Sequence, residues 1–237
     1  MNLIEEDKRI VSSGSKKHLH IDIRIPISTS NCKSLSSILT EVSNFYDLYI
    51  DNLTFTDIDT VKCVEEAFSN LRIVHNFYLE NVTAHSKEAL NLFAEVSVQA
   101  LRYTNSLFLN KVNYDSETYE RMTKAFEEVK YRRKSNSKLV VSFSENSINR
   151  FNYRGATKLI YSMIDLVREV LFDDNDVSVE GIKYFLSEMA KKERLNVSIK
   201  IYGFRKTLDT FYDQELEEIQ SMIELLEGKG AQIRIMN

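Results

Sequence analysis

Glycine and proline are scarce in this chain of 237 residues, which contains 6 glycines and 1 proline. Sandwich and barrel folds need many tight turns, so this scarcity excludes them and predicts that regular helix and strand fill most of the chain. No stretch approaches about 18 consecutive apolar residues, so no membrane span is expected. The amino-terminal segment carries Glu5, Glu6, Asp7 and Lys8 where a signal peptide would have a continuous apolar stretch.

Cysteine is also rare, and Cys32 and Cys63 are the only two. Neither has a close partner at metal-ligand spacing, and secreted repeat proteins usually carry disulfide-bonded end caps. We therefore expect buried thiols in an intracellular protein, cytoplasmic or possibly nuclear. Charge of one sign is not in excess, since 31 Lys and Arg face 35 Asp and Glu for a net charge of −4. That balance argues against a general coat for nucleic acid or membrane.

A short alternating strand motif recurs along the whole chain, and its period is the strongest signal in the sequence. Anchoring each copy on its second inward apolar residue gives separations of 29, 29, 30, 34, 29, 29 and 34 residues. The anchors are Ile21, Ile50, Leu79, Leu109, Phe143, Phe172, Ile201 and Ile235. Such regularity predicts stacked strand-plus-helix units, with about eight parallel strands and seven helices.

Each unit shows the same order of a strand, a polar turn and an amphipathic helix. In the second unit Leu48 and Ile50 alternate with polar neighbours, Thr54 and Asp57 offer N-cap oxygens, and apolar residues at helical spacing follow. Caps are also predicted at Ser86, at Asp115 or Ser116, and at Ser178. Residues 1–16 fit no unit and are expected to be a flexible lead-in, whereas 17–237 form one domain.

The units resemble leucine-rich repeats of the long, helix-containing kind found in ribonuclease inhibitor. Residues 141–148 and 170–177 match the family pattern, including its asparagine at Asn146 and Asn175. Elsewhere that slot holds Leu53, Val82, Val112 or Phe204, a departure from the pattern. The resemblance implies an α/β fold, a right-handed β/α superhelix (a leucine-rich-repeat-like solenoid) with parallel strands on a concave face and helices outside.

Residues on either side of each anchor should face away from the helices, because side chains alternate along a strand. The position before the anchor places Tyr49, Tyr78 and Phe108 on adjacent strands, a contiguous aromatic row typical of a protein interface. The alternative interpretation is that these aromatic side chains stack on one another for stability.

The position after the anchor places Asp22, Asp51 and Glu80 side by side, where their like charges repel one another. A basic segment of a partner protein would relieve that repulsion, although side chains that splay into water would relieve it as well. One such row supplies too few oxygens for a metal site. Lys200 and Arg234 reverse the sign at the far end, so that a partner carrying both charges would dock in one orientation.

No catalytic residues are predicted, because the chain lacks phosphate-loop, nucleophile-elbow, zinc-protease and dinucleotide motifs. His18 and His20 share one face of a strand but have no third ligand. The basic tract from Lys130 to Lys134 is interpreted as the solvated end of a helix rather than a nucleic-acid site.

These observations predict a protein-binding scaffold that has no cofactor and no enzymatic activity. Two alternatives stay open: the substrate-recognition part of an F-box-like ubiquitin-ligase receptor, and an enzyme on a doubly wound α/β fold.

Overall fold

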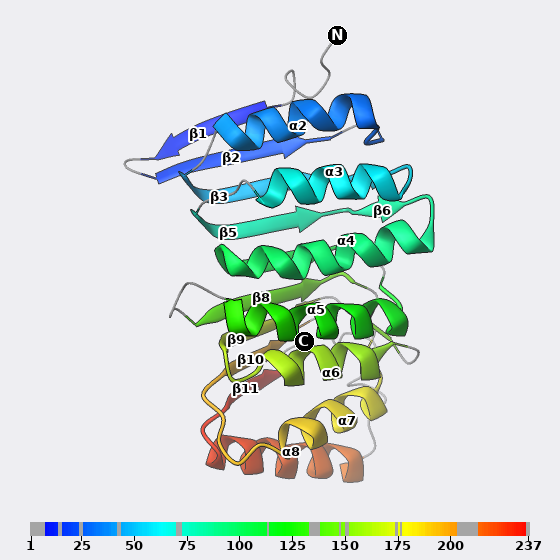
Figure 1. Ribbon diagram of the computed structural model, residues 1–237. Helices are drawn as coiled ribbons and strands as arrows, with labels where there is room; N and C mark the ends of the chain where they lie inside the picture. The colour runs from blue at the N-terminus through cyan, green and yellow to red at the C-terminus, as the bar shows by residue number, and fades with distance from the viewer. Residues whose placement is uncertain are drawn as a thin grey trace.

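The computed structural model describes residues 8–13, 16–23, 26–41, 44–69, 73–112, 114–132, 138–146, 148–149, 152–173, 175, 177–202 and 213–235. It is an α/β structure in which helices cover one face of a single main sheet (Figure 1). The strands of this sheet are β1 (Lys8–Ser13), β2 (Lys16–Asp22), β3 (Asn44–Asp51), β5 (Ile73–Glu80), β7 (Thr104–Asn110), β8 (Leu139–Ser144), β9 (Val167–Asp173), β10 (Ser198–Ile201) and β11 (Gln232–Ile235).

Within the described residues, seven α-helices follow the strands. They are α2 (Thr29–Glu41), α3 (Ile58–Ser69), α4 (Lys87–Gln99), α5 (Ser116–Arg132), α6 (Tyr153–Met163), α7 (Val179–Met189) and α8 (Asp213–Gly228). A short 3₁₀ helix, η1 (Ala100–Arg102), extends α4. Two further strands, β4 (Thr54–Phe55) and β6 (Thr83–Ala84), pair with each other in the turns that lead into α3 and α4.

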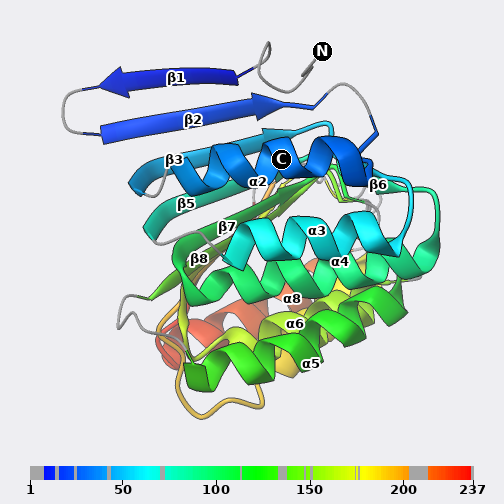
Figure 2. The same cartoon turned by 45° about the horizontal axis from the view of Figure 1, so that its top comes forward.

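Strand order in the main sheet is the order of the chain, from β1 at one edge to β11 at the other. The eight strands from β2 to β11 are parallel, as the repeat predicted. A doubly wound sheet reverses its strand order at a switch point and carries helices on both faces. Neither feature occurs here among the described residues (Figure 2).

The predicted anchors form one continuous column across the sheet. Each anchor is the direct register partner of the next, in the order Ile21, Ile50, Leu79, Leu109, Phe143, Phe172, Ile201 and Ile235. All of them except Ile235 are buried against the helices. The prediction of in-register units stacked in chain order is therefore confirmed.

Helix starts follow the predicted caps. The hydroxyl of Ser86 accepts a hydrogen bond from Ala89 N at 3.2 Å, and Ser178 accepts one from Gly181 N at 3.2 Å. Of the two residues proposed for α5, Asp115 is the cap, accepting from Thr118 N at 2.9 Å. For α3 the cap is Asp57, which accepts from Thr60 N at 2.9 Å.

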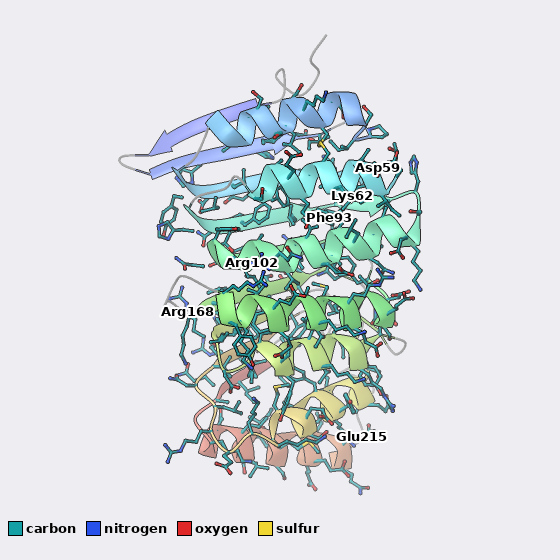
Figure 3. All side chains as sticks on the ribbon, in the orientation of Figure 1. Asp59, Lys62, Phe93, Arg102, Arg168 and Glu215 are labelled. Carbon is teal, nitrogen blue, oxygen red and sulfur yellow. A yellow bond between two sulfur atoms is a disulfide. The ribbon has the colours of Figure 1, made fainter. Side chains whose placement is uncertain are left out.

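The helices turn their apolar residues toward the sheet and their charges toward solvent. On α3 the side chains of Asp59 and Lys62 are largely exposed, whereas Phe93 on α4 is fully buried (Figure 3). Neighbouring helices pack on each other in the same succession as the strands, so the core is one continuous layer between sheet and helices.

Two buried asparagines bind the backbone of the turns between units. Asn175 Oδ1 accepts hydrogen bonds from Asn146 N at 3.0 Å and Ile148 N at 3.2 Å, while its Nδ2 donates to Phe143 O at 2.6 Å. Asn146 does the same one unit earlier, accepting from Val112 N and donating to Leu109 O. These are the two positions at which the sequence matches the leucine-rich-repeat asparagine.

Units that lack this asparagine satisfy their turns differently. Leu53 and Val82 fill the slot and are buried. There the backbone pairs with itself, since Thr83 N donates to Leu53 O and His85 N donates to Phe55 O, both at 2.9 Å. The small β4–β6 ladder thus replaces the side-chain hydrogen bonds that an asparagine would supply. Val112, the third departure, is buried and donates its backbone N–H to Asn146 Oδ1 at 2.7 Å. Phe204, the fourth, lies outside the described residues.

A residue in the left-handed backbone region follows each of four strands, two positions after its anchor. These residues are Asn52, Asn81, Lys111 and Glu145, with φ of 58°, 54°, 53° and 53°. Each donates its backbone N–H to the last residue of the next strand at 2.8 to 3.0 Å. The turn is therefore the same in four successive units, although none of the four residues is glycine.

The structure corrects the expectation of a flexible lead-in for residues 8 to 13. They form β1, which pairs antiparallel with β2, from Lys8 opposite Ile21 to Ser13 opposite Lys16. An edge strand exposes a row of unpaired backbone donors and acceptors. By pairing with β2, β1 satisfies those groups on β2. The segment does not belong to a repeating unit, which is why the period did not reveal it.

The expectation of two free thiols is wrong, because Cys32 and Cys63 form a disulfide. Cys32 lies on α2 and Cys63 on α3, and these neighbouring helices bring the two Cα atoms to 6.2 Å. The two cysteines are 31 residues apart in the sequence. They meet because each repeating unit places its helix beside the helix of the unit before it. The predicted intracellular location loses the support that free thiols would have provided.

Truncation of an anchor tests the nearest-neighbour character of the stack. Leu79→Ala should lower the free energy of unfolding by about 2 to 5 kcal/mol through a cavity at a fully buried site. Ile235→Ala should cost less, because Ile235 is partly exposed and lies on the edge strand β11. Urea denaturation of both variants measures the difference, and equal losses would contradict this account.

Removal of a turn asparagine tests its structural role. Asn175→Ala leaves two backbone N–H groups without their acceptor and should cost about 2 to 4 kcal/mol. Asn196→Ala, at an exposed position, is the control and should change stability by less than about 0.5 kcal/mol. Equilibrium unfolding in urea compares them, and a loss at Asn175 no larger than that at Asn196 would be evidence against the role.

Candidate functional site

The candidate site is the face of the main sheet on which none of the described helices lies (Figure 2), here called the open face. The residues just before and just after each anchor point to it, because the anchors themselves point to the helices. Tyr49, Tyr78 and Phe108 are direct register partners on β3, β5 and β7. Asp22, Asp51 and Glu80 are register partners on β2, β3 and β5. The structure therefore brings these six predicted residues into one patch of two parallel rows.

The aromatic row is a stack of rings. The centroids of Tyr49 and Tyr78 are 4.2 Å apart with an angle of 8° between the planes, and Tyr78 and Phe108 are 4.2 Å apart at 11°. His20 adds an edge contact with Tyr49 at 5.9 Å. The alternative interpretation, mutual stacking, thus describes the geometry. All three rings are still partly exposed, so their edges form an apolar strip on the open face.

Each member of the acidic row has a partner within the chain. Asn52 Nδ2 donates to Asp22 Oδ1 at 2.7 Å, His20 Nε2 lies 2.5 Å from Asp51 Oδ2, and Lys111 Nζ lies 2.6 Å from Glu80 Oε1. Asn52 and Lys111 occupy the left-handed turn position that ends the strands. The expected repulsion between the three carboxylates is offset by these contacts.

A second histidine and carboxylate pair lies beside the first on the same two strands. His18 Nδ1 is 2.6 Å from Asp47 Oδ2, and Asn76 Nδ2 donates to Asp47 Oδ1 at 2.7 Å. Asp47 is buried, at 8% exposure. His18 and His20 share one face, as predicted, but each is bonded to an aspartate on β3. The sequence interpretation missed these aspartate partners, although the register Ile21 to Ile50 already placed both histidines next to β3.

Burial dominates the electrostatics of this patch. It raises the pKa of Asp51, an effect that the hydrogen bond and charge of His20 oppose and that the charges of Glu80 and Asp22 reinforce. Burial likewise raises the pKa of Tyr78, with Tyr49 adding to the effect, so the Tyr78 hydroxyl stays protonated in any ordinary buffer.

Lys200 and Arg234 lie on the same face but apart from the patch. Lys200 on β10 forms an ion pair with Glu169 of β9, and that hydrogen bond raises its pKa. Its charge is therefore largely compensated within the protein. Arg234 on the edge strand β11 is exposed. Three strand spacings separate Phe108 on β7 from Lys200 on β10, roughly 14 Å at about 4.8 Å per spacing.

The basic tract lies at the end of α5. Lys130 and Arg132 are in its last turn, where positive charge complements the helix dipole, and Tyr131 is 81% exposed. Arg133 and Lys134 lie outside the described residues.

The described side chains of the open face form hydrogen bonds, ion pairs and ring contacts. His18 and His20 are held by carboxylates, and in the described part of the chain neither is hydrogen-bonded to a hydroxyl or thiol that could act as a nucleophile. Among the described residues, no group of three or more His, Cys, Asp or Glu is arranged to hold a metal ion. Within the same ranges, no helix combines the length and apolar composition that a bilayer crossing requires.

No protein-family model matches the chain, and no curated protein matches it either.

The raised pKa of Asp51 predicts a pH effect on stability. A carboxyl group with a higher pKa in the folded state favours folding below its unfolded value of about 3.8, and this contribution is lost as the pH rises through the folded pKa. Relative to Asp51→Asn, the wild type should therefore lose stability as the pH rises above the unfolded value of about 3.8.

Urea denaturation at a series of pH values measures this difference. Asp59→Asn, at a position 81% exposed on α3, controls for the change from carboxylate to amide. Superimposable profiles for the Asp51 and Asp59 variants would show that burial of Asp51 has no energetic consequence.

Proposed function

We propose that the chain is a leucine-rich-repeat-like solenoid that works as a non-enzymatic scaffold and binds a partner protein on the open face of its sheet. The fold part of the proposal is supported by strand order that follows the chain, by the unbroken anchor column, and by Asn146 and Asn175. The concave curvature and the right hand of the superhelix belong to this proposal.

The observation that carries the binding proposal is the stacked aromatic row on the open face, where its rings are partly exposed. Tyr49, Tyr78 and Phe108 form a rigid apolar strip whose rings are already ordered by stacking. Ordering a side chain on association costs about 0.5 to 1.5 kcal/mol, and rings that are ordered beforehand avoid most of that cost. Partly exposed tyrosines in such an arrangement have the character of interface anchors.

The acidic row contributes differently, because its charges are already paired. A Lys or Arg of the partner must replace His20 at the partly buried Asp51 or Lys111 at the exposed Glu80, so it exchanges an existing contact of the carboxylate for a new one. Exposed ion pairs are worth about 0 to 1 kcal/mol, and the net gain in affinity from this exchange is smaller still. The acids therefore guide a basic segment toward the aromatic strip, while the strip retains it. Lys200, paired with Glu169, adds little to orientation.

The enzyme alternative depended on a doubly wound sheet, and the strand order argues against that arrangement. The F-box-like alternative is a special case of partner binding, and no observation favours it over the general proposal.

Affinity capture from extracts of the native cell tests the proposal. Proteins retained by the wild type should be lost with the triple variant Tyr49→Ala, Tyr78→Ala, Phe108→Ala. Tyr131→Ala, which truncates an exposed aromatic on the helix layer, is the matched control and should retain them. Capture of the same proteins by the wild type and the triple variant would place binding elsewhere.

Association kinetics with a captured partner separate the two rows. Tyr78→Ala should raise the dissociation rate about tenfold or more with little change in association. Asp51→Lys should slow association, and the effect should shrink as salt is added. Asp59→Lys, the same charge change on α3, should leave both rates unaltered. Surface plasmon resonance measures them, and the proposed division of roles fails if Asp51→Lys and Asp59→Lys behave alike.

A further inference from the structure

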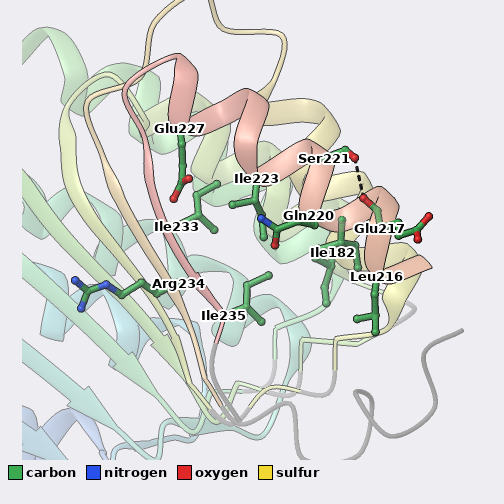
Figure 4. A pocket seen from close by; sticks show the side chains of 11 residues that line it. Ile182, Leu216, Glu217, Gln220, Ser221, Ile223, Glu227, Ile233, Arg234 and Ile235 are labelled. Carbon is green, nitrogen blue, oxygen red and sulfur yellow. Dashed lines mark hydrogen bonds between the residues drawn. The ribbon is translucent and has the colours of Figure 1, made fainter. Parts of the chain in front are cut away.

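A second candidate surface lies at the end of the sheet, away from the open face. A groove of about 900 Å³ runs between α8 and the edge strand β11, with Ile182 of α7 at its base (Figure 4). Leu216, Gln220, Ile223 and Glu227, which recur at helical spacing, form the α8 wall. Ile233 and Ile235 form the β11 wall, while Arg234 points away from α8 (Figure 4). The groove is thus mainly apolar and belongs to the helix layer.

The groove exists because the described residues cover α8 on one flank only. Each helix from α3 to α7 packs between two others, and α5, between α4 and α6, buries Met122 and Phe126 completely. On α8 the residues Ile219 and Leu226 are buried, but Leu216 is 40% exposed and Leu225 is 52% exposed. None of the described residues covers this second flank or pairs with the outer edge of β11.

The α8 wall of the groove is acidic, whereas Arg234 of β11 also borders the groove. The sequence of α8 contains six carboxylates and no Lys or Arg. Glu218 is paired with Lys183, but among the described residues no ion pair forms with Glu217 or Glu227. Both of these line the groove, Glu217 near the start of α8 and Glu227 near its end (Figure 4). They are ten residues apart, or about 15 Å along the helix axis.

We propose that this groove binds a basic amphipathic helix of a partner protein. The helix lies beside α8 over β11, in the place that one more helix of the layer would occupy. Its apolar face, with residues at positions i, i+3 and i+7, contacts Leu216, Ile223 and Ile233. Two Lys or Arg residues about ten positions apart flank that face and pair with Glu217 and Glu227. This partner is distinct from the one that uses the aromatic row.

A designed peptide of about 16 residues serves as the probe, with a leucine face and two lysines about ten positions apart. A second peptide carries glutamates in place of the lysines. Fluorescence anisotropy measures the binding of each labelled peptide to the full chain. The lysine peptide should bind the wild type more tightly than the glutamate peptide does, and its helical circular-dichroism signal should rise on binding.

Variants of α8 identify the binding site. Glu217→Lys with Glu227→Lys should weaken the lysine peptide about tenfold and restore binding of the glutamate peptide, which also shows that the variant is folded. Gln220→Trp, which fills the groove without changing charge, should weaken the lysine peptide to a similar extent. Glu120→Lys with Glu127→Lys makes the same charge change on exposed positions of α5 and should alter binding by less than about twofold.

Four outcomes would overturn the proposal. Equal weakening by the α5 and α8 double variants would mean general attraction to an acidic protein. Equal binding of the two peptides would remove the role of Glu217 and Glu227. A β-type rather than helical signal would indicate strand addition to β11. If an apolar dye binds the wild type but not Gln220→Trp, and neither peptide binds, the groove would be a small-molecule cavity.

Discussion

No strand of this protein can shield its own apolar residues, and the rest of the structure depends on that constraint. Each parallel strand presents at least two inward apolar side chains, such as Phe77 and Leu79 on β5, and these pack against the neighbouring strands and the helices. Burial therefore passes from unit to unit through direct contacts. The register of the open face follows from the register of the core, so the aromatic and acidic rows are consequences of the anchor column.

The same constraint reaches the turns, where buried backbone groups need partners. The chain meets this need in two ways: buried Asn146 and Asn175 in the later units, and the β4–β6 ladder in the earlier ones. Both solutions hold the turns in place while their side chains differ. Sequence variation at the asparagine slot is thus compatible with one continuous stack.

Much of the architecture could be predicted from the sequence, because a period of about 29 residues makes equivalent positions neighbours. The anchor column, the caps of α4, α5 and α7, and the six residues of the open-face patch follow from it. The period says nothing of β1, which is not a repeating unit. Contacts between different positions of adjacent units were missed as well, including Cys32 with Cys63, His20 with Asp51 and Lys111 with Glu80. The predicted register placed the two residues of each pair on neighbouring units. Whether they touch depends on the length and direction of their side chains, which the period does not give.

The left-handed turns connect backbone conformation to the charge of the open face. Asparagine tolerates this conformation better than lysine or glutamate, for which it costs about 1 kcal/mol. Lys111 nevertheless holds it, and its side chain reaches both Glu80 and Glu145. A ligand cation that displaces Lys111 from Glu80 also removes a contact that holds the turn in its strained form. Under the proposed binding mode, occupancy of the acidic row is therefore coupled to mobility of the adjoining turn, and the rim of the sheet should loosen when a partner's cation binds Glu80.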